Sequence, residues 1–254
     1  MENHKKTILL FDVDGTLTAS RQIITAEIKE FISSVCEKFS CGLVGGSDCV
    51  KITEQMGGQE SLDRMGFIYV FSENGLVACK RGKTIGLMNL VEHMGEEKLQ
   101  ALINFALGYF ASLKLPAKRG TFVEFRKGMI NFCPVGRSCS QAERQQFSDL
   151  DQKEHIREEM VKHLREKFDA DGWEFSIGGQ ISIDAFPKGW DKRYCLQYLE
   201  KDFDTIHFFG DRVLKGGNDH EIYSDPRTIG HQVMNPADTK KQVLELLSEN
   251  GVTL

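Results

Sequence analysis

Two aspartates separated by one residue follow a short apolar run near the start of the chain. Residues 8–11 (ILLF) lead directly into Asp12, Val13, Asp14 and Gly15. A continuous apolar run of this length indicates a strand buried on both faces of a parallel sheet, and the glycine marks the turn that ends it. Side chains at i and i+2 of an extended backbone leave it on the same side, so both carboxylates can meet one ligand. Ligands of open α/β sheets bind just beyond the carboxyl ends of the strands, where this pair lies.

Two neighbouring carboxylates repel each other unless a cation lies between them. Mg²⁺ suits this position because it prefers oxygen ligands and keeps coordination sites open for a phosphate. One carboxylate can then attack phosphorus while the other transfers a proton. Taken alone, the motif is equally consistent with an acidic turn at a strand end. A calcium-binding EF-hand loop fits less well, because a strand precedes the motif and the closing glutamate is missing.

Three further residues repeat this placement or support it. An apolar run at 205–209 ends in Gly-Asp211, and another at 41–44 is followed by Gly-Gly-Ser47. Ser47 can donate to a phosphate oxygen, although by itself it is better explained as the N-cap of the next helix. Lys192 can offset charge between a nucleophile and a phosphate, although most helix lysines are simply solvated. The glycine-rich loop after Asp211 alone is equally consistent with a surface turn.

The first third and the end of the chain alternate strands with helices, which predicts a parallel sheet. The amphipathic pattern of 25–39 predicts a helix between the first two strands. The remaining elements that we expect in this part are strands 67–71 and 228–230, a helix at 190–200 and a C-terminal helix that begins at Asn235.

The middle of the chain has a different pattern, because its strands are joined by short turns. Strands joined in this way form an antiparallel sheet. We therefore predict an α/β protein with a Rossmann-like parallel-sheet core at 1–84 and 189–254, and an inserted α+β cap domain at 85–188. The segments behind this prediction are the hairpins 121–132 and 173–185, an apolar helix at 96–113 and a charged helix at 141–168 that is interrupted near Asp149.

Composition limits the possible functions. The net charge of -5 argues against general nucleic-acid binding, and no apolar run approaches the ~20 residues of a membrane span. The seven cysteines are an odd number and form no CxxC pair, which is typical of reduced cysteines. The N-terminal residues are polar and lack the apolar stretch of a signal peptide. We therefore expect a cytoplasmic protein that does not bind membranes.

The inserted segment carries polar residues suited to a sugar phosphate. Arg126, Arg137 and Arg144 lie along or just after the first hairpin, and arginine binds two phosphate oxygens with its planar fork. Ser182 and Asp184 lie on one face of the second hairpin, where they can contact sugar hydroxyls. Without the aspartate motifs, a charged outer surface is the better explanation. With them, the arginines favour an enzyme that holds two phosphates rather than one.

Seven short blocks lie along nearly the whole chain: FDVDGTLT, VGGSD, TFVEFR, GRSCS, SIGGQIS, GWDKRYCL and FFGD. Together they resemble the eukaryotic phosphomannomutases of the haloacid-dehalogenase superfamily. The resemblance implies interconversion of mannose 6-phosphate and mannose 1-phosphate through a phosphoaspartate and a hexose 1,6-bisphosphate, which supplies GDP-mannose synthesis. It also implies Mg²⁺, a hexose 1,6-bisphosphate activator and a homodimer joined through the caps.

The same resemblance assigns roles to individual residues. Asp12 matches the nucleophile and Asp14 the acid/base, with Ser47 and Lys192 supporting them. Asp12, Asp14 through its backbone, and Asp211 match the magnesium ligands. The residues matched to substrate contacts are Arg21, Arg126, Arg137, Arg144, Ser182 and Asp184, and those matched to a second cation loop are Tyr223, Asp225 and Thr228.

Two alternatives remain open from the sequence. A sugar-phosphate phosphatase of the same superfamily would need no second phosphate site, so the three cap arginines count against it. A binding module without activity would be expected to lack one of the core residues Asp12, Asp14, Lys192 or Asp211, and all four are present.

Overall fold

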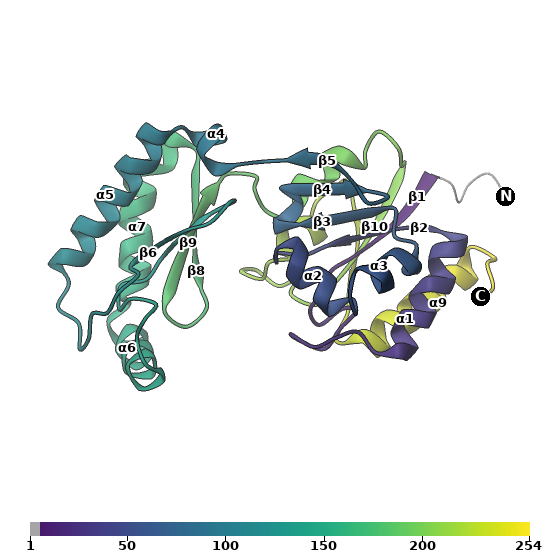
Figure 1. Cartoon of the computed structure of the whole chain (residues 1–254), viewed down its shortest axis with the longest axis horizontal. Coiled ribbons are helices and arrows are strands. Elements are labelled where there is room, and N and C mark those ends of the chain that lie inside the picture. Colours follow the sequence, from purple (N-terminus) through teal and green to yellow (C-terminus); the bar gives the residue numbers. More distant parts are fainter. Residues whose placement is uncertain (1–5) are drawn as a thin grey trace. The chain divides into compact units, whose positions relative to one another are not determined.

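A computed structural model of the protein describes residues 6–254 (Figure 1). The chain divides into two compact units. The first contains the N-terminal part up to Leu87 together with Gly189–Leu254, and the second is Met88–Lys188. No helix within the described residues is both long and apolar enough to cross a bilayer.

The first unit is built on a seven-stranded sheet in the order β11-β10-β1-β2-β3-β4-β5. Neighbouring strands from β11 to β3 are parallel, whereas β4 and β5 are antiparallel additions that the sequence pattern did not predict. The sequence pattern does not indicate these strands, because β5 is an exposed edge strand in which apolar and polar residues do not alternate regularly. The strands are β1 (Thr7–Phe11), β2 (Ser40–Val44), β3 (Tyr69–Ser72), β4 (Val77–Lys80), β5 (Lys83–Leu87), β10 (Thr205–Gly210) and β11 (Ile229–Gln232).

Both faces of this sheet are covered, which is why its central strands are apolar throughout. Leu9 and Phe11 of β1 belong to the core that includes α1 and α9, which lie side by side in Figure 1. Ile8 and Leu10 belong to the opposite core, formed with η4 and α8. The helices of this unit are α1 (Ala26–Lys38), α2 (Cys49–Gln55), α3 (Gln59–Met65), η2 (Glu73–Gly75), η4 (Lys192–Tyr198), α8 (His220–Tyr223) and α9 (Pro236–Glu249).

A pair of histidines lies on the α1 side of this sheet. Nδ1 of His207 on β10 is 2.8 Å from Nε2 of His231 on β11, and the His231 ring stacks on Phe209. Burial, with a smaller contribution from His231, lowers the pKa of His207 to about 4. Burial also lowers the pKa of His231. Both imidazoles are therefore neutral in the folded protein at pH 7.

We expect this pair to make the first unit less stable in mild acid. The unfolded chain protonates His207 below its ordinary pKa of 6.5, whereas the folded protein resists protonation down to about pH 4. The contribution of neutral His207 to the free energy of unfolding is fully present above pH 6.5. It is lost as the pH falls from 6.5 to 4, by about 3 kcal/mol for a pKa shift of this size. Urea titrations between pH 7.5 and 4.5 should give a smaller pH dependence for His207→Gln than for the wild type. The exposed His163 provides the control, since His163→Gln should leave the wild-type slope unchanged.

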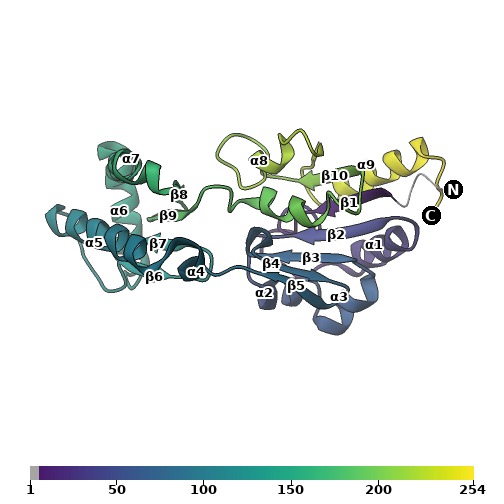
Figure 2. The same ribbon diagram turned by 90° about the horizontal axis from the view of Figure 1, so that it is seen from above.

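The second unit is a four-stranded antiparallel sheet in the order β6-β7-β9-β8, with helices on one face. Both views show α5 and α7 along the same side of the sheet (Figure 2), and Phe105 of α5 meets Phe168 of α7 edge to face. The elements are α4 (Leu90–Met94), α5 (Glu96–Ser112), β6 (Val123–Phe125), β7 (Ile130–Phe132), α6 (Gln141–Glu154), α7 (Ile156–Phe168), η3 (Asp169–Asp171), β8 (Trp173–Gly178) and β9 (Ser182–Pro187).

The charged helical segment breaks at His155, so the predicted interruption near Asp149 is wrong. His155 has a left-handed backbone (φ 54°) between α6 and α7. The Asp151 carboxylate accepts hydrogen bonds from the backbone N–H (2.8 Å) and Nε (2.7 Å) of Arg157. The Asp151 carboxylate thereby satisfies a backbone N–H group in the first turn of α7. No local sequence pattern indicates that Asp151 and Arg157 are partners.

Candidate active site

Three carboxylates of the first unit converge at the carboxyl end of its parallel sheet. Asp12 directly follows β1, and Asp211 directly follows the neighbouring parallel strand β10. Asp219 comes from the loop beyond Asp211. One carboxylate oxygen from each of the three lies within 4.8 Å of the others. The sequence therefore correctly predicted that Asp12 and Asp211 meet, and the structure adds Asp219.

Lys192 lies among these acids with no exposed side-chain surface. Its Nζ donates to Oδ1 of Asp12 and to Oδ1 of Asp219, the latter at 2.5 Å. Asp219 also accepts the backbone N–H of Arg212 at 3.0 Å, so both of its oxygens are occupied. Burial alone would lower the pKa of Lys192, but the two carboxylates outweigh it and raise the pKa above its ordinary value. The lysine is thus held as a buried ammonium beside Asp12.

One ammonium does not balance three carboxylates. Burial raises the pKa of Asp12 to about 7, against the opposing effect of Lys192. Burial and Asp219 raise the pKa of Asp211. Oδ1 of Asp211 is buried and has no hydrogen-bond partner within the described residues. An excess of buried negative charge and an unpartnered oxygen are the features that a hard divalent cation resolves, so this donor set fits Mg²⁺.

Gly15 allows Asp211 to approach the turn after β1. Its backbone has φ +78°, and a Cβ at this position would lie 2.2 Å from Oδ2 of Asp211. Any other residue would push the carboxylate away and strain the turn.

Asp14 is held by contacts that fall on a single oxygen. Its Oδ1 accepts the backbone N–H of Arg21 at 2.6 Å and Nε2 of Gln55 at 2.8 Å. Arg21 adopts a left-handed backbone (φ 59°), an uncommon conformation for a non-glycine residue, and this conformation accompanies the contact. Since both hydrogen bonds go to Oδ1, Oδ2 is the oxygen suited to carry a proton.

A cavity of about 110 Å³ lies beside Asp12 and Asp14 in the first unit. Its walls include Asp12, Asp14, Ser47, Gln55 and Asn218. Ser47 lies in the loop after β2 and is not the N-cap of α2, because Asp48 caps that helix through its side chain. This removes the simpler explanation of Ser47 and leaves it beside the carboxylates.

Three of the predicted substrate residues of the second unit meet in one polar network. Arg137 donates to Oδ1 of Asn131 at 2.7 Å, and Asn131 donates to Oδ1 of Asp184 at 2.6 Å. Glu124 pairs with Arg126 (Nε, 2.7 Å) and with Arg137 (Nε, 3.2 Å). The structure therefore brings Arg126, Arg137 and Asp184 into one network.

Ser182 and Arg144 stand apart from this network. The Ser182 hydroxyl donates to the backbone carbonyl of Gly178 at 2.8 Å. Arg144 lies in the first turn of α6, half-buried, and its guanidinium makes no hydrogen bond or ion pair within residues 6–254. Its charge is available for an anion.

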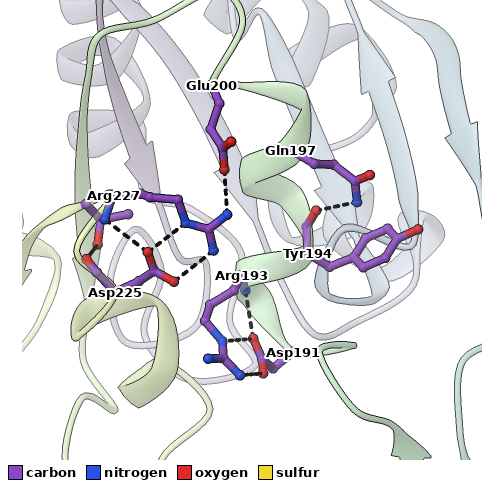
Figure 3. Close-up of polar contacts among 8 residues, drawn as sticks. Asp191, Arg193, Tyr194, Gln197, Glu200, Asp225 and Arg227 are labelled. Carbon is purple, nitrogen blue, oxygen red and sulfur yellow. Dashed lines mark hydrogen bonds and ion pairs between the residues drawn. The ribbon is translucent and has the colours of Figure 1, made fainter. Parts of the chain in front are cut away.

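The predicted second cation loop is closed by an arginine. Both oxygens of Asp225 face Arg227 (Figure 3). Nε of Arg227 donates to Oδ1 at 2.8 Å, and Nη2 donates to Oδ2 at 2.8 Å. Arg227 also reaches Glu200, and the Thr228 hydroxyl donates to the carbonyl of Asp225 at 3.1 Å. Tyr223 ends α8 just before this loop. The Asp225 carboxylate is therefore already neutralised by a side chain of the same loop.

Comparison with known proteins identifies the family. A sequence profile of the eukaryotic phosphomannomutases matches residues 28–249. The chain belongs to this family. It is 56% identical to a phosphomannomutase of Glycine max, covering 96% of this chain and 97% of that protein. It is 52% identical to phosphomannomutase 1 of Homo sapiens, covering 95% of this chain and 92% of the human protein.

Solved structures with low sequence identity show the fold. Trehalose-6-phosphate phosphatase of Aspergillus fumigatus has a TM-score of 0.59 and 16% identity, covering 96% of this chain and 93% of that one. A haloacid dehalogenase-like hydrolase from Bacteroides thetaiotaomicron has a TM-score of 0.53 and 14% identity, covering 85% and 84%. The chain accordingly shares its fold with these phosphatase and hydrolase structures, as the resemblance of the sequence blocks implied.

Several residues of the site were not found by sequence reasoning. Gln55 contacts Asp14, and Asn131 and Glu124 contact the arginines and Asp184. Gln55 carries no signal by itself, because its partner is 41 positions away. Asn131 and Glu124 had one weak signal, since they alternate with apolar residues in the two strands of the first predicted hairpin.

Proposed function

We propose that the protein is a phosphomannomutase that interconverts mannose 6-phosphate and mannose 1-phosphate and supplies GDP-mannose synthesis. The observation that carries this proposal is the identity of more than half of the residues with phosphomannomutases along nearly the whole chain. The group of Asp12, Lys192, Asp211 and Asp219 supplies the chemistry that such a reaction needs.

Asp12 is the proposed nucleophile and Asp14 the proposed acid/base. In its phosphorylated form, Asp12 transfers the phosphoryl group to the free hydroxyl of a hexose monophosphate, while Oδ2 of Asp14 accepts the hydroxyl proton. The resulting hexose 1,6-bisphosphate turns end for end. Its other phosphoryl group then bonds to Asp12 as the ester oxygen leaves, and Asp14 returns the proton to that oxygen. No phosphate is lost in the cycle.

The neighbours of the two aspartates position and neutralise them. Lys192 fixes Oδ1 of Asp12 and offsets its charge, which lowers the repulsion of an incoming phosphate dianion. Arg21 and Gln55 fix Oδ1 of Asp14. Ser47 and Asn218 line the same cavity and offer donors for phosphate oxygens.

Mg²⁺ is the proposed cofactor, held by Asp12, the backbone of Asp14 and Asp211. When bound, it neutralises the carboxylates and polarises the phosphoryl group. A second cation near Tyr223, Asp225 and Thr228 would have to compete with Arg227 for the Asp225 carboxylate. Hexose 1,6-bisphosphate is the proposed activator, because it phosphorylates Asp12 and so starts the cycle.

Residues 85–188 are proposed to act as the cap domain, whose arginines hold the phosphate that is not being transferred. Arg126, Arg137 and Arg144 provide three guanidinium groups for that phosphate, while Ser182 and Asp184 contact sugar hydroxyls. The cap must also keep water from the phosphoaspartate, since hydrolysis would turn the mutase into a phosphatase.

We further propose a cytoplasmic homodimer joined through α5. Leu107 is 42% exposed although α5 buries a separate apolar stripe, so this helix presents more apolar surface than its own unit covers. All seven cysteines are free, which suits a reducing compartment.

A product assay tests the activity. The protein is incubated with mannose 1-phosphate, Mg²⁺ and a trace of glucose 1,6-bisphosphate, and mannose 6-phosphate and free phosphate are measured together. We expect rapid formation of mannose 6-phosphate with little free phosphate. Stoichiometric release of phosphate and free mannose would instead identify a sugar-phosphate phosphatase and contradict the proposal.

A further inference from the structure

A row of polar side chains crosses the sheet of the second unit. Glu124 on β6 pairs in register with Asn131 on β7, and Asn131 pairs with Asp184 on β9, which in turn pairs with Ser176 on β8. Residues in register on neighbouring strands share a face, so the four side chains leave the sheet on one side. The alternate residues are apolar, as Phe132 and Ile183 are fully buried.

Asn131 is the central member of this row. Only 3% of its surface is exposed, and both ends of its amide are used. Arg137 donates through Nη1 to Oδ1 (2.7 Å), while Nδ2 donates to Oδ1 of Asp184 (2.6 Å). A guanidinium can only donate and a carboxylate can only accept, so the orientation of the amide is fixed by its partners. A primary amide is one of the few side-chain groups that can bridge two such groups.

The contacts of Asp184 explain why it needs this partner. A Cβ on Gly178 would lie 2.4 Å from Oδ2 of Asp184, so the carboxylate is placed directly over that glycine. The hydrogen bond from Asn131 holds Oδ1, which fixes the rotation of the carboxylate on the polar face. Arg137, for its part, is held on two sides, by Asn131 and by Glu124.

We propose that Asn131 is a positioning residue that couples the phosphate-binding guanidinium of Arg137 to the sugar-binding carboxylate of Asp184. This inference rests on the proposed function, which gives those two residues their roles. Through Asn131, the second phosphate site and the hydroxyl-binding site act as one preorganised unit. Loss of this bridge weakens substrate binding without impairing the phosphoryl-transfer step at Asp12.

The substitution Asn131→Asp separates positioning from folding by a difference between its effects on KM and kcat. The new carboxylate still accepts from Arg137, but it has no proton to donate to Asp184 at pH 8, and the two carboxylates repel each other. The other charged groups facing this position are Arg137 and Glu124, and Glu124 is itself paired with Arg126.

We expect the KM of Asn131→Asp for mannose 1-phosphate at pH 8 to rise at least tenfold relative to the wild type. The kcat should stay within threefold of the wild type. Asn131→Ala removes both contacts, so its KM should rise about tenfold. Ser176→Ala is the matched control, because Ser176 lies in the same row, makes no polar contact within the described residues, and should change KM less than twofold.

A KM for Asn131→Asp or for Asn131→Ala within twofold of the wild type would overturn the proposal, as would a tenfold fall in kcat with an unchanged KM. If the wild type lacks mutase activity, the proposed function fails, and calorimetric titration of the same variants with mannose 1-phosphate still tests the bridge. The dissociation constants should then show the same pattern as the KM values. Absence of binding by the wild type would contradict the inference as well.

Discussion

The Asp12→Asn variant should lose mutase activity by a factor on the order of 10⁴ or more, because an amide cannot replace a carboxylate as the nucleophile. The dissociation constant for mannose 1-phosphate should remain within tenfold of the wild type. The variant retains the ammonium of Lys192 and the hydrogen bonds to Asp14, so the surrounding site stays in place. Product formation and calorimetric titration measure the two quantities separately.

The same substitution should not destabilise the metal-free protein. The pKa of Asp12 is raised to about 7 because its charged form is buried among other acids. A group with a raised folded pKa costs stability once the pH exceeds its unfolded value, and an uncharged amide removes that cost. We expect the melting temperature in EDTA at pH 8 to equal or exceed that of the wild type.

Two further variants make this result interpretable. Asp12→Ala should lose as much activity, which excludes hydrolysis of the new amide back to a carboxylate as a source of residual turnover. Asp204→Asn changes an exposed aspartate that pairs with Lys6 on the surface, and it should leave activity and stability unchanged. Retention of even a few per cent of wild-type turnover by both Asp12 variants would contradict the assignment of the nucleophile.

The convergence of Asp12 and Asp211 could be predicted because it depends on a rule of topology. Each follows a short apolar run, and parallel strands present their carboxyl ends at one edge of the sheet. The rule needs no knowledge of partners. This rule cannot identify Gln55, because Gln55 is linked to Asp14 by a hydrogen bond that forms only when the chain folds. Residues that act through another side chain carry no pattern of their own.

The errors in the predicted fold have a similar origin. The helix break was expected near Asp149, whereas it occurs at His155, where the ion pair between Asp151 and Arg157 fixes the start of the next helix. The strands β4 and β5 were missed because β5 is an exposed edge strand. In both cases a tertiary interaction or an edge position overrides the local signal.

The largest combined effect on stability and activity is expected for Lys192→Met. This change leaves Asp12 and Asp219 buried and facing each other without a cation in the metal-free protein, and breaking a buried ion pair in this way costs ~3–5 kcal/mol. Activity should fall at least 10³-fold, since the incoming phosphate then meets an uncompensated carboxylate. Urea titrations in EDTA and the mutase assay provide the two measurements. Lys6→Met, in an exposed pair with Asp204, should change neither.

The pH dependence and a double variant separate the structural role of Lys192 from its catalytic one. Without the ammonium, nothing opposes the burial that raises the pKa of Asp12, so the cost is greatest at pH 8 and shrinks as the pH falls toward 5. The double variant Lys192→Met with Asp219→Asn removes one buried charge, and it should recover most of the stability at pH 8. It should not recover activity, because Asp12 still lacks its ammonium partner. Recovery of both would mean that Lys192 acts only by neutralising Asp219, and equal stability of Lys192→Met and wild type at pH 8 would contradict the buried ion pairs.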